Sequence, residues 1–318
     1  MKKILFFSAA AALMLASCAN EETVQAPKGN AIDFGNAFVN NSTKAEDLTT
    51  TGIKNFDVYG YMQSMNGVVF NGEEVSKTGD NWTYSPTQYW TPEKAYWFAA
   101  IAPSKAATFT APTGELPTGA AGTITFENTK GDTDLCSGYL NYTAKATGND
   151  VQKFTFGHLL SRVKFTFNNK MANANAKLVI SNVKITATNT AGTYNCVTSV
   201  WTANAATNDV DFVISNNEVA QNGFNATEPM YLIPGANSVQ YNVEFSVVRY
   251  QGTELLDETP LNHKVVISGV QLELGKSYNF TADITDENVD PDNKPEPIVF
   301  GVETVAGWGP DVENNLTL

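Results

Sequence analysis

The sequence predicts an all-β protein built from two β-sandwich domains. The chain has 318 residues, enough for two domains of ordinary size, and it lacks the long heptad repeats of helical bundles and coiled coils. Thr and Asn are abundant, and 23 Gly and 13 Pro interrupt the chain throughout. Short runs of alternating apolar and polar residues recur at near-regular spacing between these interruptions, which is typical of antiparallel strands in sandwiches.

The first 17 residues are predicted to be a lipoprotein signal peptide. Two lysines precede the apolar run 4–15, which is too short to span a bilayer as a permanent helix. The run ends in Leu15-Ala16-Ser17-Cys18, which resembles a bacterial lipobox. We therefore expect Cys18 to carry a diacylglycerol group. A plain secretory signal with a chance Cys, or a retained membrane anchor, are the alternatives.

The mature chain is expected to begin with a polar tether at residues 18–30. A first sandwich is predicted at 31–150 and a second at 151–318. The boundary is placed there because the alternating pattern stops at residues 148–150 and restarts at Phe154.

Each predicted strand is a run with apolar residues at every second position, or a short apolar run between turn residues. In the first half these runs contain Ile32/Phe34, Phe56/Val58, Val68/Phe70, Trp82/Tyr84, Phe98/Ala100 and Ile124/Phe126. In the second half they contain Phe154/Phe156, Val163/Phe165/Phe167, Val179/Val183/Ile185, Val210/Phe212/Ile214, Tyr231–Ile233, Val243/Phe245/Val247, Val265–Ile267 and Tyr278/Phe280/Ala282/Ile284.

An acidic, Pro-rich stretch at 286–297 is predicted to be a solvated loop before a last strand near 298–302. Alternating Asp and Asn side chains at its start are similar to those of a calcium-binding loop. The sixth position is Pro291, where such a loop needs Gly, and the twelfth is Pro297, where it needs a bidentate Glu. We therefore expect no calcium site here.

Charge and composition argue against several functional classes. The formal net charge is −13, with only two arginines, so the chain has no basic surface for nucleic acid. Two His and three Cys are too few for a multi-ligand zinc cluster or a disulfide-stapled scaffold. Cys136 and Cys196 are expected to be unbonded thiols, with a disulfide between them as the alternative.

No catalytic constellation is recognisable in the sequence, so we predict neither enzyme activity nor a cofactor or metal site. His158 lies between Phe156 and Leu159 with no partner cluster beside it, and His263 is far away in a polar stretch. A Ser/His/Asp arrangement, a phosphate-binding loop and a paired-carboxylate frame are all missing. His158 is therefore expected to be a structural, hydrogen-bonded side chain.

Aromatic residues are concentrated in one stretch of the first half. The stretch contains Trp82, Tyr84, Tyr89, Trp90, Tyr96 and Trp97. Flat rings can stack on sugars, so a glycan-binding surface lipoprotein is the alternative function. Because Trp82 and Tyr84 share one face of a predicted strand, packing in a core is favoured.

The order of the strand motifs resembles the Bacteroidetes fimbrillin family, the Mfa-like and FimA-like lipoproteins that assemble type V pili. In the first half the matching stretches are Ile32-Asp33-Phe34, Phe56-Asp57-Val58-Tyr59-Gly60-Tyr61, Trp82-Thr83-Tyr84-Ser85-Pro86, Gln88-Tyr89-Trp90 and Tyr96-Trp97-Phe98-Ala99-Ala100-Ile101-Ala102-Pro103. In the second half they are Thr133-Asp134-Leu135, Phe156-Gly157-His158-Leu159-Leu160-Ser161-Arg162-Val163-Lys164-Phe165, Leu232-Ile233-Pro234-Gly235 and Leu274-Gly275-Lys276-Ser277-Tyr278.

This resemblance implies two transthyretin-like β-sandwich domains and a structural role as stalk, anchor or tip of an adhesive fimbria. It implies that other fimbrial subunits are the partners, and that host or bacterial surfaces are the ligands. The acidic residues after Cys18 resemble the signal of lipoproteins exported to the outside of the outer membrane. The lipid on Cys18 would then hold the chain to that membrane.

The resemblance also implies assembly by strand exchange. A first strand at 31–38 would fill a groove until a protease cut after it, and a neighbouring subunit would then supply a replacement strand. Many relatives carry an Arg at the cleavage position, whereas this chain offers Lys44. Residues 298–318 are the expected donor, with a fold-back into their own domain as the alternative.

Overall fold

The computed structural model describes residues 30–35, 38–39, 52–63, 67–79, 81–114, 119–204, 207–235, 239–290 and 296–305. These residues form 22 β-strands and no α-helix, which confirms the predicted all-β class. Within this described part, no helix is long and apolar enough to cross a membrane.

The strands have the following bounds in chain order: β1 (Phe38–Val39), β2 (Asn55–Met62), β3 (Val68–Thr78), β4 (Asn81–Thr83), β5 (Ala95–Ala102), β6 (Ala107–Thr110), β7 (Thr123–Glu127), β8 (Cys136–Thr143), β9 (Thr155–His158), β10 (Ser161–Asn169), β11 (Ala176–Asn189), β12 (Ala191–Asn195), β13 (Val200–Ala203), β14 (Thr207–Asp211), β15 (Glu218–Ala220), β16 (Phe224–Ala226), β17 (Met230–Leu232), β18 (Val239–Gln251), β19 (Glu254–Leu255), β20 (Leu261–Val270), β21 (Ser277–Ile284) and β22 (Phe300–Val305).

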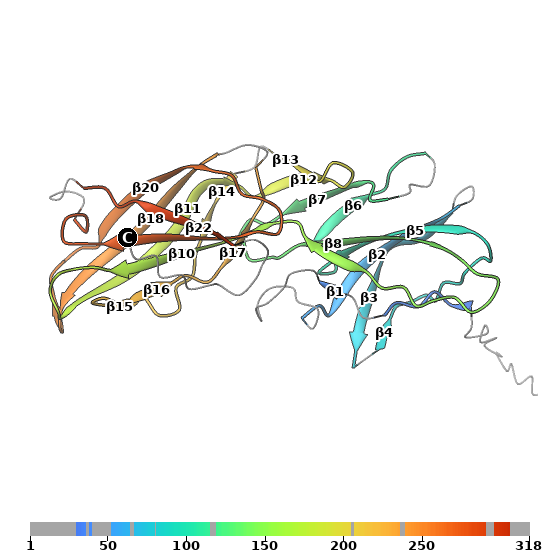
Figure 1. Cartoon of the computed structure of the whole chain (residues 1–318), viewed down its shortest axis with the longest axis horizontal. Coiled ribbons are helices and arrows are strands. Elements are labelled where there is room, and N and C mark those ends of the chain that lie inside the picture. Colours follow the sequence, from blue (N-terminus) through green and yellow to red (C-terminus); the bar gives the residue numbers. More distant parts are fainter. Residues whose placement is uncertain are drawn as a thin grey trace, which may run out of the picture.

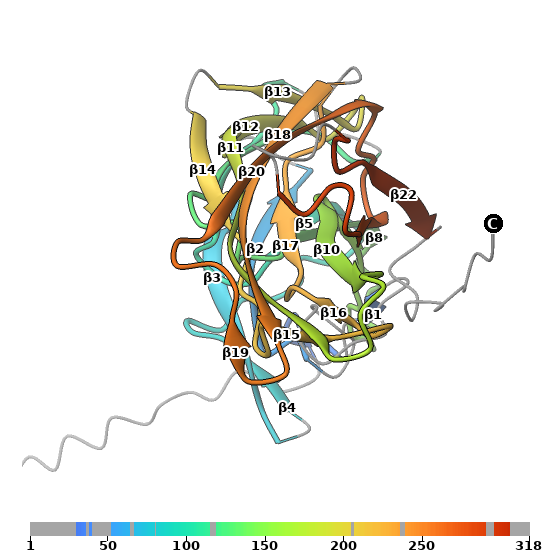
Figure 2. The ribbon, with the colours of Figure 1, turned by 90° about the vertical axis from the view of Figure 1, so that its left-hand side faces the viewer.

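The strands form two sandwiches that lie end to end along the long axis of the molecule (Figure 1). The first sandwich pairs a seven-stranded sheet, in the order β1-β9-β8-β5-β2-β3-β4, with a four-stranded sheet, β13-β12-β7-β6. The second pairs a five-stranded sheet, in which β16-β10-β21-β22 are neighbours and β17 also pairs with β10, with a six-stranded sheet built on β14-β11-β18-β19. In Figure 2 the two layers of the second sandwich are seen along that axis, with β11, β18 and β20 on one side and β10 and β22 on the other.

Strand β5 shows how local sequence sets the first sandwich. Successive side chains point to opposite faces of a strand, and this strand reads Ala-Tyr-Trp-Phe-Ala-Ala-Ile-Ala, so both faces are apolar. Trp97 and Ile101 enter the core between the two sheets. Tyr96 and Phe98 enter a second core on the opposite face. The seven-stranded sheet is therefore covered on both sides at its centre.

The second sandwich has a single core between its two sheets. Its inner residues come from alternating positions of the longest strands, and these lie where the sequence predicts: Val163, Phe165, Phe167, Val183, Ile185, Val243, Phe245, Tyr278, Phe280 and Ile284. In β11 the predicted start of the run at Val179 is wrong, because Leu178 and Ile180 are the buried residues there and a register shift between Ser181 and Lys184 then turns Val183 and Ile185 inward. Full burial of each large apolar side chain stabilises the fold by roughly 1.5–3 kcal/mol.

Two strand pairs correct the expectation of purely antiparallel sandwiches. Strand β10 pairs with β21 in parallel over eight residue pairs, and β1 pairs with β9 in parallel. Each parallel pair joins strands that are far apart in the sequence, because a parallel connection needs a long crossover that no hairpin can supply. The periodicity of a strand carries no information on the direction of its partner.

Strand pairing also crosses the expected boundary near residue 150. Strand β9 lies after that boundary but pairs with β8 in the first sandwich. Strands β12 and β13 follow β11 of the second sandwich, and β12 pairs with β7 of the first. The division into domains at 31–150 and 151–318 remains a proposal. It places β9, β12 and β13 in the second domain, whereas their strand pairing places them in the first sandwich.

The acidic loop is less solvated than predicted. Val289 is fully buried in the second core, and its carbonyl lies 3.1 Å from Nε2 of His263. Asn288 closes the turn by accepting the amide of Thr285 through Oδ1 at 2.8 Å. The predicted last strand is present as β22, which pairs antiparallel with β21.

Candidate functional site

The N-terminal segment, defined here as residues 30–35 and 38–39, is bonded to the first sandwich, and its residues 30–35 lie between the loop at residues 88–90 and the chain at Gln152, a position called the groove below. On one side the amide of Ile32 donates to the carbonyl of Gln88 at 2.9 Å, and the amide of Trp90 donates to the carbonyl of Asn30 at 2.9 Å. These bonds join the segment to a loop more than 50 residues further along the chain.

The other side of the segment is bonded to the chain just before β9. The amide of Gly35 donates to the carbonyl of Gln152 at 2.8 Å, and the amide of Gln152 donates to the carbonyl of Asp33 at 2.8 Å. Residues Phe38 and Val39 then form β1, the edge strand of the seven-stranded sheet. The backbone of residues 30–35 is thus hydrogen-bonded on both sides, as a strand within a sheet would be.

Two side chains of the segment point into the groove. Ile32 is fully buried and Phe34 is 5% exposed, whereas Asp33 between them is exposed. The Phe34 ring contacts five other aromatic rings, with centroids 5.5–6.2 Å away: Phe56, Phe70, Tyr84, Phe98 and Phe154. The alternation of apolar and polar residues predicted for this stretch therefore places Ile32 and Phe34 in the core and Asp33 in solvent.

Gly60 makes the floor of this groove possible. A Cβ atom at this position would lie 2.7 Å from Cδ2 of Phe70 and 2.9 Å from Cδ1 of Phe98. Both distances are shorter than any packed side chain tolerates, so only glycine lets these rings lie over β2.

Tyr84 contacts the segment through its hydroxyl and its ring. Its hydroxyl donates to the carbonyl of Ile32 at 2.6 Å. Burial raises the pKa of Tyr84 to about 12, so the phenol stays protonated and keeps donating in alkaline solution as well as at neutral pH.

The two site residues predicted from sequence, Cys18 and Lys44, lie outside the described residues. Both remain predictions. In the sequence they stand on either side of the N-terminal segment, so a lipid on one and a cut at the other would concern the segment between them.

The aromatic stretch forms a core and not a sugar platform. Trp90, Tyr96 and Trp97 are each at most 2% exposed. The Trp90 ring packs edge-on against Tyr96, with centroids 4.7 Å apart. Tyr89 is 42% exposed and is the most open ring of the six, so the alternative glycan-binding surface lacks its main rings.

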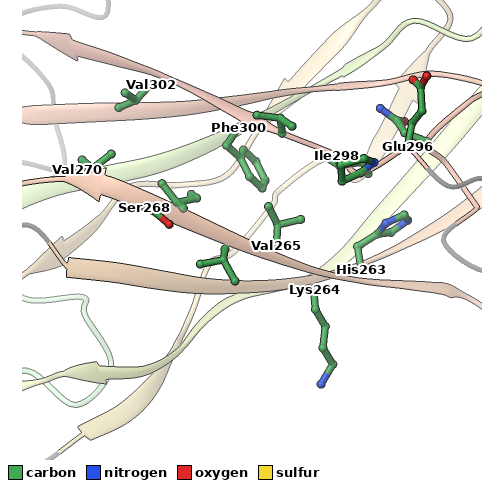
Figure 3. Close-up of a pocket in the computed structure, with 14 residues that line it drawn as sticks. His263, Lys264, Val265, Ser268, Val270, Glu296, Ile298, Phe300 and Val302 are labelled. Atoms are coloured by element: carbon green, nitrogen blue, oxygen red, sulfur yellow. The ribbon is translucent and has the colours of Figure 1, made fainter.

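A second groove runs between β20 and β22, the outer strands of the two sheets of the second sandwich. It measures about 660 Å³. Figure 3 shows Val265, Ile298 and Phe300 turned into it, with His263 toward one end and Lys264 pointing away. Its lining combines apolar side chains with polar ones, which are His263, Lys264, Ser268, Asn288 and Glu296.

His158 has partners that sequence analysis missed. Its Nδ1 lies 3.0 Å from Oδ2 of Asp134 and 3.2 Å from Sγ of Cys136. Both neighbours are more than 20 residues away in sequence, and only the pairing of β8 with β9 brings them together. The expected hydrogen-bonded His158 is found, but in a cluster of three functional groups.

The other buried thiol, Cys196, has a different setting. The hydroxyl of Tyr139 donates to its Sγ at 2.9 Å, and burial raises the pKa of the thiol. A neutral buried thiol is a poor nucleophile. Cys136 and Cys196 are both free thiols in the structure.

Comparison with known proteins identifies a family. Residues 43–308 match the model of a family described as fimbrillin-like. No curated protein matches the chain.

Two solved structures are similar in fold. A fimbrial protein from Bacteroides vulgatus ATCC 8482 has a TM-score of 0.57 and 17% identity, over 88% of this chain and 99% of that one. A candidate cell adhesion protein from Bacteroides ovatus ATCC 8483 has a TM-score of 0.50 and 14% identity, over 89% of this chain and 99% of that one.

Proposed function

The chain belongs to the fimbrillin-like family, and on that premise we propose that it is a structural subunit of an adhesive surface fimbria that assembles by strand exchange. The observation that carries this proposal is how the N-terminal segment is held: by main-chain hydrogen bonds and by two buried apolar side chains, Ile32 and Phe34. Its place in the fimbria, as stalk, anchor or tip, follows from whether the segment is removed.

The interactions that hold the segment are ones that another strand could make. Four main-chain hydrogen bonds fix residues 30–35, and they depend on an extended backbone and not on particular side chains. The side-chain requirement is short: apolar groups at Ile32 and Phe34, with a polar residue between them. A strand from a second subunit with the same alternation meets both conditions.

Removal of the segment would leave a surface that needs a new strand. The ring cluster around Phe98 would lose the side chain that covers it, and the outer edge of β9 would lose its partner. Exposed apolar rings together with unpaired N–H and C=O groups favour pairing with another chain.

Residues 298–318, the donor proposed from sequence, could be donated only after contacts within the second sandwich are broken. Ile298 and Phe300 are 4% and 9% exposed in the second core, and β22 is bonded to β21 in its own sheet. Donation of the whole range would require β22 to leave that sheet. In this structure residues 300–305 instead fold back into their own domain as strand β22, which is the alternative to donation.

The proposed location is the outside of the outer membrane, with the chain held by a lipid on Cys18. A cut after Lys44 would free the subunit from both the lipid and the segment, as a stalk subunit requires. An uncut chain would stay lipidated with its groove filled, which suits an anchor.

A structural role is also supported by the chemistry of the buried groups. His158 and Cys136 lie in the interior, with His158 7% exposed and Cys136 not exposed at all. The groove between β20 and β22 is lined mostly by aliphatic side chains. These features support a structural function, in which the chain packs and pairs strands with other subunits.

Limited trypsin digestion of the full chain, followed by peptide binding and size analysis, tests the proposal. We expect the cut protein to bind a fluorescent peptide of residues 30–39, which the uncut protein should refuse because its groove is filled. A peptide with Ile32 and Phe34 both changed to Ser is the matched control, and it should bind neither form.

A second peptide, of residues 298–318, tests the donor separately. Binding of this peptide to the cut protein supports donation from the C-terminal end. A cut protein that stays monomeric and binds neither apolar peptide would contradict strand exchange through this groove.

A further inference from the structure

Three side chains of different chemistry meet where β8 begins and β9 ends. Cys136 is the first residue of β8, and Asp134 precedes it by two residues. His158 is directly opposite Cys136 in the antiparallel ladder. A backbone bond from the amide of Leu159 to the carbonyl of Leu135, at 2.8 Å, continues the ladder past this pair. Strand pairing therefore sets the positions of all three groups.

The cluster is compact and buried. Nδ1 of His158 is 3.2 Å from Sγ of Cys136 and 3.0–3.1 Å from both carboxylate oxygens of Asp134. One ligating atom from each residue lies within 4.8 Å of the others. The imidazole and carboxylate are 2% and 4% exposed, and Cys136 is fully buried.

We propose that Asp134, Cys136 and His158 form a binding site for one zinc ion. Thiolate, imidazole and carboxylate are the ligands that zinc takes in proteins, whereas a sulfur ligand disfavours calcium and magnesium. With bond lengths of about 2.0–2.3 Å, a tetrahedral zinc ion separates its ligand atoms by roughly 3.3–3.6 Å. The observed separations from His158 Nδ1, 3.0 Å to the Asp134 carboxylate and 3.2 Å to Cys136 Sγ, need to widen by only a few tenths of an ångström, and the carboxylate and Sγ lie within 4.8 Å of each other.

Charge balance favours this ion in an interior position. The thiolate of Cys136 and the carboxylate of Asp134 together carry two negative charges, and neutral His158 adds none. A divalent cation therefore leaves the three ligands and the metal neutral as a group, which avoids the cost of a net buried charge. Binding would release the thiol proton of Cys136 to solvent.

The proposed site is structural. Three residues leave one coordination position of a tetrahedral ion, which the second oxygen of Asp134 would fill. The ion would tie β8 to β9 just before the chain passes from the first sandwich into β10. It would therefore stabilise the connection between the two sandwiches.

Cobalt substitution tests the site, because a thiolate bound to Co²⁺ gives a charge-transfer band that a carboxylate or imidazole alone cannot give. The test uses the full chain with Cys18→Ser and Cys196→Ser, so that Cys136 is its only thiol. We expect one equivalent of Co²⁺, the charge-transfer band, and displacement of the band by one equivalent of Zn²⁺.

The matched variant adds Cys136→Ser to that background, and near-ultraviolet circular dichroism checks that it is folded. We expect the band to disappear and the affinity for zinc to fall at least tenfold. Folded protein without a charge-transfer band before this change, or with a zinc affinity that the change does not alter, would overturn the proposal and leave a hydrogen-bonded cluster.

Thermal unfolding supplies a readout that does not depend on the variant. Zinc in excess should raise the melting temperature of the wild-type chain, and a chelator should reverse the rise. An unchanged melting temperature at saturating zinc would also count against a metal that ties β8 to β9.

Discussion

The ring of Phe34 stacks on the ring of Phe154, with centroids 5.8 Å apart and an interplanar angle of 18°. Phe34 belongs to the N-terminal segment, and Phe154 comes immediately before β9, with which β1 of that segment pairs. The same short stretch of chain therefore receives both an aromatic contact and a parallel strand from the segment. Phe34 is accordingly the side chain whose loss should most weaken the binding of the N-terminal segment to the first sandwich.

Phe34→Ala should lower the free energy of unfolding by about 3–5 kcal/mol, because it removes a buried ring and leaves a cavity among five others. The neighbouring Asp33→Ala is the matched control, since that side chain is exposed, and it should change stability by no more than about 0.5 kcal/mol. Urea unfolding followed by tryptophan fluorescence measures both. Equal effects of the two changes would show that the ring does not hold the segment.

Cys18→Ser should move the chain from the detergent phase to the aqueous phase in a phase-partition assay, because the change removes the residue that would carry the proposed lipid. Cys196→Ser, which changes a buried thiol outside the lipobox sequence, should leave partition unchanged. Mass measurement of the N-terminal peptide would identify the acyl chains. A Cys18→Ser chain that stays in the detergent phase would rule out lipidation at this residue.

Lys44→Gln should prevent the first trypsin cut, because Lys44 is the only Lys or Arg between Lys28 and Lys54. Wild-type protein should give an early fragment that begins at Ala45, as measured by mass spectrometry of a time course. Lys54→Gln serves as the control and should leave that fragment in place. An early fragment beginning elsewhere in both proteins would refute selective processing at Lys44.

His263 should make stability depend on pH. Burial lowers its pKa below the ordinary value of 6.5, so the folded state binds the proton less readily than the unfolded state. Stability should therefore be full above about pH 6.5 and fall as the pH drops toward the lower folded-state value. Neutral His263 stacks on Phe245, with centroids 4.9 Å apart, and lies 3.1 Å from the carbonyl of Val289.

Urea unfolding at several pH values compares wild type with His263→Gln, which should lose this part of the pH dependence. Lys264→Gln, at a side chain that is 82% exposed, is the control and should keep it. A pH profile of His263→Gln identical to that of the wild type would assign the dependence to other groups.

Side-chain alternation predicted the class of the fold and most of its cores, because a strand places every second residue on the same face. The runs at Phe56/Val58, Phe98/Ala100 and Val243/Phe245 are buried where the pattern places them. The order of the strand motifs was enough to indicate the fimbrillin-like family, and the lipobox was readable as a local motif.

Local sequence also determined which residues fill the groove. Ile32 and Phe34 alternate with exposed Asp33, so this stretch was predicted as a strand with one apolar face. The expectation that nucleic acid is not a partner rests on composition alone, because the formal net charge is −13 and the chain has two arginines.

Tertiary structure alone decided which strands are partners. Main-chain hydrogen bonds do not depend on side-chain identity, so any exposed edge can accept any strand of suitable length. That is why the pairing of β12 with β7, and the parallel pairing of β10 with β21, were not predicted. The meeting of His158 with Asp134 and Cys136 has the same cause, because those residues become neighbours only through the register of β8 and β9.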